Sequence, residues 1–354
     1  MSGGVDSAVS AWLLQRWGYP LQGLFMSNWE DDDDAYCTTA RDFQDARRVC
    51  ALIGIPLHRV SFAAEYRQHV FAHFLKEYEA GRTPNPDVLC NREIKFGVGM
   101  DYMRRLGGAW IATGHYARVA HGADGSRLLK AADAAKDQSY FLHGICAQAL
   151  DRCLFPIGAM TKAQVRELAR AEGLPVFDKP DSTGICFIGE RPFEEFLGRY
   201  LRQSQGPIET DAGRVVGEHR GLPFYTLGQR SGLKVGGRAG AAQAPWYVAG
   251  KDSARNALIV VQDPDHPRLL STQFEVAELN WLGPAPRAGT ACHVKTRYRQ
   301  RDLACVLHPD GAARWRVELE QPARAVTPGQ YAVFYDGDNC LGGGVISQQW
   351  NIIN

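Results

Sequence analysis

The sequence has no apolar run that approaches the length of a membrane span, and no basic segment followed by an apolar stretch stands at its start. Its nine cysteines are scattered and include no Cys-x-x-Cys pair. An odd number of unpaired cysteines is typical of neither a secreted disulfide framework nor a zinc ribbon. We therefore expect a cytoplasmic protein without a membrane partner, in which most cysteines are buried as small apolar residues.

The sequence also lacks a strong net charge, an internal repeat and a low-complexity segment. A net charge of +1 argues against a basic coat that would bind nucleic acid over the whole surface. Positions 199–255 are an exception, with nine basic and four acidic residues. This stretch is either a solvated face or a surface for an anionic partner. The acidic run 30–34 is interpreted as a solvated loop, and no residue is assigned as a direct metal ligand.

The first part of the chain alternates short apolar runs with helical patterns. Strands are predicted at 21–26, 57–60 and 109–113, and helices at 42–53, 66–78 and 161–172. Such alternation favours an α/β fold with a parallel sheet and helices on both faces. We assign this domain to residues 1–203.

The composition changes beyond about Gly206, where glycine becomes frequent and helical periodicity disappears. We assign residues 204–271 to a small, Gly-rich central domain. Residues 272–354 then alternate apolar and polar positions in short, evenly spaced runs, which indicates an all-β, barrel-like domain. Its predicted strands are 291–298, 303–307, 315–319 and 331–335.

The most informative segment is Ser2-Gly3-Gly4-Val5-Asp6-Ser7, which stands before an apolar helical pattern. A Gly-rich loop that opens a helix exposes backbone N–H groups to an anion, and the helix dipole favours negative charge there. No Gly-Lys-Ser/Thr ending follows, so this is not a Walker loop. Asp6 suits a phosphate-bound Mg²⁺ better than a phosphate itself. The alternative is a surface turn with a helix cap.

Two cysteines have an environment that favours reactivity. Cys90 stands near the start of a helical pattern with Arg92 and Lys95 nearby, which should lower its pKa. Cys186 lies between Gly184 and Gly189, in what reads as a bendable loop. Taken singly, each cysteine is more often inert.

Seven motifs in one order make the chain resemble the tRNA-specific 2-thiouridylases, a family of ATP pyrophosphatases, over nearly its whole length. The motifs are Ser2–Ser7, Asn85–Cys90, Thr113–Arg118, Lys136–Tyr140, Ser182–Phe187, Arg297–Arg299 and Pro328–Gln330. In that family a buried strand precedes the Gly-rich loop, so we expect that the first strand is missing here.

The resemblance implies a reaction in which ATP, with Mg²⁺, adenylates the C2 oxygen of the wobble uridine of a tRNA and releases pyrophosphate. A cysteine persulfide then delivers sulfur to C2, and AMP leaves. This chemistry is reasonable because an amide-like carbonyl needs a better leaving group and a persulfide is a strong nucleophile. The implied partners are tRNAs for Lys, Glu and Gln and a sulfur donor, either a cysteine desulfurase or a sulfur-relay protein.

The resemblance also assigns roles to individual residues. Cys186 would carry the persulfide, Cys90 would be its partner in sulfide release or a disulfide, and Asp87 would act as acid or base near the target base. The residues implied for ATP are Ser2, Gly3, Gly4, Val5, Asp6, Ser7, Met26 and Gly114. Those implied for tRNA are Asn85, Pro86, Asp87, His115, Lys136, Asp137, Gln138, Arg297, Tyr298 and Gln330.

Two alternatives remain. Another carbonyl-adenylating ATP pyrophosphatase would use ammonia or an amine and would not need the cysteine pair. A non-catalytic tRNA-binding protein, inactivated by the missing first strand, would bind tRNA without turning over ATP.

Overall fold

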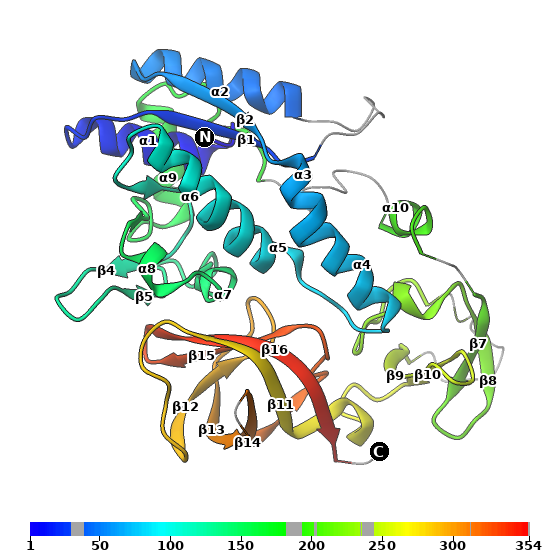
Figure 1. Cartoon of the computed structure of the whole chain (residues 1–354). Coiled ribbons are helices and arrows are strands. Elements are labelled where there is room, and N and C mark those ends of the chain that lie inside the picture. The colour runs from blue at the N-terminus through cyan, green and yellow to red at the C-terminus, as the bar shows by residue number, and fades with distance from the viewer. Residues whose placement is uncertain are drawn as a thin grey trace.

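The computed structural model describes residues 1–29, 39–181, 193–201, 204–233, 235, 244–311 and 313–352 (Figure 1). The predicted acidic loop at 30–34 and the motif Ser182–Phe187, with Cys186, lie outside these residues. Within the described part, no helix is long and apolar enough to cross a membrane.

The N-terminal part confirms the predicted α/β class with parallel strand pairs. Its first elements are α1 (Val5–Arg16), β1 (Gly23–Ser27), α2 (Thr39–Ile53) and β2 (Leu57–Ser61). Strands β1 and β2 pair in parallel, and α2 runs along them (Figure 1). A second parallel pair joins β3 (Ile111–Ala112) to β6 (Cys153–Leu154). Short apolar strands separated by helices produce this arrangement because a parallel neighbour needs a long crossover.

The predicted single helix at 66–78 is wrong in detail. The segment is α3 (Ala63–Tyr66), a π-helical turn η2 (Arg67–Phe71) and α4 (Ala72–Glu79). A second such run consists of α5 (Pro86–Leu89), the π-helical η3 (Cys90–Val98) and α6 (Gly99–Arg105). Gly97 departs from helical geometry, with φ −100° and ψ −105°. Wide π turns are frequent at functional sites, and this one begins at Cys90.

The rest of the N-terminal part contains short elements. They are β4 (Arg118–Ala120), β5 (Arg127–Leu129), α7 (Ser139–Leu142), α8 (Ala147–Leu150), α9 (Lys162–Ala171) and α10 (Phe193–Gly198). Helix α9 confirms the prediction at 161–172. Thr161 caps it and exchanges hydrogen bonds with Gln164, which forms a capping box.

The central part is a four-stranded sheet in the order β8-β7-β10-β9. Its elements are β7 (Gly206–Thr210), β8 (Val215–His219), the 3₁₀ turn η4 (Leu222–Phe224), β9 (Tyr247–Asp252) and β10 (Ala257–Val261). Its apolar side chains, such as Ile208 and Val260, share one core with Phe74 and Tyr78 of α4.

The C-terminal part confirms the predicted barrel. After η5 (Pro267–Leu269) come β11 (Leu270–Trp281), β12 (Thr290–Lys295), β13 (Leu303–Asp310), β14 (Arg314–Arg324), β15 (Tyr331–Asp336) and β16 (Asn339–Asn351). The sheet closes because β11 pairs with both β14 and β16. Strand β5 also pairs with β16, so the β4–β5 hairpin extends the barrel sheet.

Candidate active site

The Gly-rich loop leads directly into α1, as predicted. Gly3 has φ +76°, and a Cβ there would lie 2.3 Å from the Asp42 carbonyl oxygen, so only glycine fits. Gly4 is the N-cap of α1 and provides no side-chain cap. The Ser2 and Ser7 hydroxyls lie 3.1 Å apart beside this turn. Because the first N–H groups of α1 have no side-chain cap, they are available to an anion.

Gly114 closes one side of the loop. It follows β3, and a Cβ on it would lie 2.7 Å from both the Asp6 carbonyl carbon and the Ser7 nitrogen. Met26 lies in β1, and its Sδ would be 3.2 Å from a Cβ on Gly99. The loop therefore meets Gly114 just beyond the end of β3, the end of a parallel strand at which such folds bind ligands. Val5 is buried in the core, so only its backbone faces the loop.

A group of cations surrounds the loop, and two of them, Lys162 and Lys179, are not among the residues predicted from the sequence. The Lys162 ammonium donates to both Asp6 carboxylate oxygens, at 2.7 and 2.8 Å, and lies 2.8 Å from an Asp181 oxygen. Lys179 donates to the Gly3 carbonyl at 3.1 Å and to Asp42 at 2.7 Å. Lys179 also donates to Asp45 at 2.6 Å, so these lysines bring a network of ion pairs from distant parts of the chain to the start of α1.

Asp181 is the carboxylate that holds this group together. It accepts hydrogen bonds from Lys136 at 2.7 Å and from Arg166 at 2.8 Å, in addition to its contact with Lys162. Burial raises the pKa of Asp181, but the hydrogen bonds from Lys136 and Lys162 outweigh it and hold the pKa well below its ordinary value. Asp181 therefore stays ionised and keeps the cations in place.

One signal in the sequence could have pointed to Lys162. It occupies the first position of α9, where the helix dipole disfavours a cation and acidic residues are usual. A lysine in that place needs a carboxylate partner. Nothing local shows that the partner is Asp6, which lies 156 residues away in the sequence.

The second half of the site is built around α5. Asn85 caps this helix by accepting from the Asp87 backbone N–H at 3.2 Å, and Pro86 occupies its first turn. Burial raises the pKa of Asp87, and the charge of Lys95 opposes that shift only in part. Cys90 is buried one turn further along the chain. The Arg92 guanidinium, two residues beyond Cys90, pairs with the adjacent Glu93 carboxylate at 2.7 Å.

His115 is nine-tenths buried and pairs its Nδ1 with the Thr113 hydroxyl at 2.7 Å. Burial, aided by the charge of Lys95, lowers the pKa of His115 well below its ordinary value, so the ring is neutral near pH 7. Lys95 therefore influences both Asp87 and His115 from η3.

Three neighbouring residues predicted to contact tRNA have internal partners. Lys136 binds Asp181, as described above. The buried Asp137 carboxylate accepts from the backbone N–H groups of Ala131 at 3.1 Å and Ser139 at 3.2 Å. Gln138 accepts from the Tyr116 N–H at 2.9 Å. Their side chains fix the loop before α7, and a role toward tRNA stays a prediction.

The barrel contributes the remaining predicted residues. Gln330 donates to the Thr83 carbonyl at 2.8 Å, and the Thr83 N–H donates to Pro328 at 3.1 Å. The turn before β15 thus supports the segment that leads into α5. Tyr298 lies against Phe141, with ring centroids 4.4 Å apart. Arg297 donates to the carbonyls of Leu227 and Ala325, both at 2.8 Å, and so joins the central part to the barrel.

Comparison with protein families gives three consecutive matches. A tRNA methyl transferase HUP domain matches residues 1–190, a tRNA methyl transferase PRC-barrel domain matches 194–262, and an aminomethyltransferase β-barrel domain matches 271–346. Together with the loop at the start of α1, they define a nucleotide-binding HUP protein of the ATP-pyrophosphatase type that carries two β domains. The predicted boundaries at 203 and 271 stay predictions.

Near-full-length relatives make the assignment more specific. Three proteins named tRNA-specific 2-thiouridylase MnmA are 54% identical over 382 residues (Methylibium petroleiphilum), 56% over 358 (Verminephrobacter eiseniae) and 56% over 349 (Cupriavidus taiwanensis). Each alignment covers 98% of this chain and 96–97% of the relative. The chain belongs to the tRNA-specific 2-thiouridylase family.

Proposed function

We propose that the chain is a tRNA sulfurtransferase, which uses ATP to activate the C2 oxygen of the wobble uridine and replaces it with sulfur from a cysteine persulfide. The products are 2-thiouridine, AMP and pyrophosphate. The observation that carries this proposal is the similarity to 2-thiouridylases over 98% of the chain. The anion-binding loop at the start of α1 supports it, because adenylation needs a site for the phosphates of ATP.

The described residues fit a nucleoside triphosphate. The uncapped start of α1 offers N–H donors, and Lys162 and Lys179 add positive charge beside Gly3 and Asp6. A Mg²⁺ ion bound with the phosphates would neutralise part of their charge, and Asp6 is the carboxylate placed to hold it. Here Asp6 accepts from Lys162 and from the Tyr116 hydroxyl at 2.8 Å.

Asp87 suits proton transfer at the activated base. A carboxyl group whose pKa is raised by burial holds its proton nearer to neutral pH than an exposed one, so it can both donate and accept. Asn85 and Pro86 fix its position at the start of α5. The uridine reaches this buried place only by leaving its stack.

The sulfur step is assigned to two cysteines. The outer sulfur of a Cys186 persulfide attacks C2, and the C2 oxygen leaves with AMP. Attack of the Cys90 thiolate on the Cys186 Sγ then breaks the S–S bond, which frees the 2-thiouridine and leaves a Cys90–Cys186 disulfide for an external thiol to reduce. Release of sulfide by Cys90 before the attack is the alternative order.

The partners follow from the same assignment. We propose tRNAs for Lys, Glu and Gln as substrates, and a cysteine desulfurase or a sulfur-relay protein as the sulfur donor, in the cytoplasm.

A Cys186→Ser variant separates the proposal from its rivals. We expect it to lose 2-thiouridine formation while it still binds tRNA and releases pyrophosphate from ATP in a tRNA-dependent way. Cys146→Ser is the matched control, because Cys146 is exposed. An amide-forming ATP pyrophosphatase would keep full activity without Cys186. A non-catalytic tRNA-binding protein would bind tRNA and release no pyrophosphate in any variant.

A further inference from the structure

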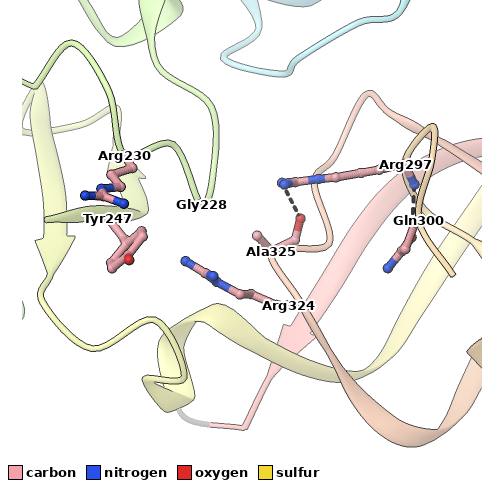
Figure 2. Close-up of a pocket in the computed structure, with 7 residues that line it drawn as sticks. All are labelled: Gly228, Arg230, Tyr247, Arg297, Gln300, Arg324 and Ala325. Atoms are coloured by element: carbon pink, nitrogen blue, oxygen red, sulfur yellow. Dashed lines mark hydrogen bonds between the residues drawn. The ribbon is translucent and has the colours of Figure 1, made fainter. Parts of the chain in front are cut away.

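A pocket of about 470 Å³ lies between the central part and the barrel (Figure 2). Residues after η4 and at the start of β9 form one wall, and the β12–β13 loop and the end of β14 form the other. None of the lining residues belongs to the Gly-rich loop or to α5. The residues that matter here are Arg230, Tyr247, Arg297, Gln300 and Arg324.

The lining of this pocket is cationic. It includes three arginines and no carboxylate. Among the described residues, Arg230, Arg297 and Arg324 form no ion pair. The Arg324 guanidinium carbon lies 4.5 Å from the centroid of the Tyr247 ring, which holds it over the pocket. Burial lowers the pKa of Arg297, and the nearby charge of Arg324 also lowers it, because the two cations repel each other. An anion between them would relieve this repulsion.

The walls of the pocket are held in place before any ligand binds. Arg297 donates from Nη2 to two backbone carbonyls and, at 3.1 Å, to the Thr327 hydroxyl. Gln300 accepts the Arg297 N–H at 3.1 Å through Oε1, and its amide nitrogen points away from that bond (Figure 2). Ala325 adopts φ +53°, an uncommon conformation for a residue with a side chain. Backbone strain of this kind collects at binding sites.

We propose that this pocket binds a phosphodiester group of the tRNA backbone, with Arg230 and Arg324 as its direct ligands and Arg297 as the fixed cationic wall. The inference rests on the proposed function, which makes tRNA the anionic partner. Guanidinium groups match a phosphate through paired N–H donors. Arg297 of the pocket directly precedes Tyr298 in the sequence. Tyr298 would stack on a base while the pocket binds the neighbouring phosphate.

The test is the salt dependence of tRNA binding. Unmodified tRNA is titrated with the full chain between 50 and 200 mM salt, for the wild type, the double variant Arg230→Gln/Arg324→Gln and the control Arg316→Gln. Arg316 is exposed on the same strand as Arg324 and has no ion pair among the described residues. The plot of log K against log salt has a negative slope. Loss of one phosphate contact makes this slope shallower by about 0.7–0.9 and weakens binding on the order of tenfold at 0.1 M salt.

We expect this loss in the double variant only, with an unchanged thermal midpoint. The single variant Arg324→Lys keeps the positive charge. It should therefore keep the salt slope of the wild type and bind tRNA more tightly than the double variant. The affinity for ATP should not change. A double variant that loses affinity for ATP but not for tRNA would overturn the inference in favour of a nucleotide phosphate.

The inference and the proposed function fail in different ways. If the wild type thiolates tRNA and the double variant binds it with the same affinity and slope, only the phosphate site is refuted. If the wild type does not bind tRNA, both proposals fall.

Discussion

At the scale of single residues, the main feature of the site is that its charges come from positions far apart in the sequence. Lys162 meets Asp6 and Lys179 meets Gly3 across more than 150 residues, and Asp181 joins them through Lys162. The loop itself could be predicted, because its glycines and the helix after it are adjacent. Its cations could not, since a lysine at the start of a helix carries no local sign of which carboxylate it will face.

Replacement of Lys162 tests whether these cations serve the loop. We expect Lys162→Met to weaken ATP binding by a factor on the order of ten or more, because a hydrogen bond to a charged group is worth about 1.5–3 kcal/mol. Lys162→Arg keeps the charge and should lose much less. Titration calorimetry with ATP measures both, and a Lys162→Met variant that binds ATP like the wild type would refute the role.

A second residue-scale prediction concerns Glu77, a buried carboxylate at the end of α4. Arg82 donates to it at 2.6 Å, and chiefly this hydrogen bond lowers the pKa of Glu77. The stabilisation is fully present above the unfolded pKa of about 4.3 and is lost as the pH falls through the lower pKa of the folded state.

We therefore expect Glu77→Gln to reduce stability by about 1–2 kcal/mol at pH 7, and the difference from the wild type to shrink below about pH 4. Glu79→Gln is the control, because Glu79 is exposed on the same helix. Urea midpoints at both pH values measure the effect. An equal difference at pH 7 and pH 3.5 would rule out the charge of Glu77 as its source.

At the scale of elements, the sequence predicts what local pattern determines. The strands at 57–60, 303–307 and 331–335 and the helix at 161–172 all occur, because alternation, helical period and capping act over a few residues. The π turn inside 66–78 escapes prediction, since it differs from an α-helix by one hydrogen-bond step. The pairing of β5 with β16 also leaves no local signal, because Leu128 and Cys340 meet only through the fold.

The turn before β15 offers an element-scale test of how the barrel supports α5. Gly329 has φ +90°, and a Cβ there would lie 2.9 Å from the Thr83 nitrogen. We expect Gly329→Ala to reduce the free energy of unfolding by roughly 2 kcal/mol. It should also slow thiolation at least tenfold, because the segment that leads into α5 shifts and Asp87 is no longer held in position.

Gly337→Ala is the matched control. Gly337 has φ +56° in a turn of the same barrel, and a Cβ there would have nothing within 4 Å, so only the conformational cost applies. Thermal midpoints and thiolation rates compare the two variants. Equal rates in both would show that the turn does not position α5.

At the scale of the whole molecule, contacts between the three parts hold the candidate site and the arginine pocket in place. The N-terminal part supplies the loop and α5, and the barrel supports α5 through Gln330. Arg297 ties the central part to the barrel, beside the pocket of Figure 2. The relatives align over 98% of the chain, so the similarity extends beyond the HUP domain to the central part and the barrel.

The reaction itself is tested by nucleoside mass spectrometry of unmodified tRNA incubated with this protein, ATP, Mg²⁺ and a sulfide source. Sulfide is already at the oxidation level of the product sulfur and attacks the activated C2 directly, so the assay needs neither the natural sulfur donor nor a persulfide on Cys186. We expect 2-thiouridine at the wobble position, formed only when ATP is present. A protein that binds both tRNA and ATP but forms no 2-thiouridine would refute the proposed reaction.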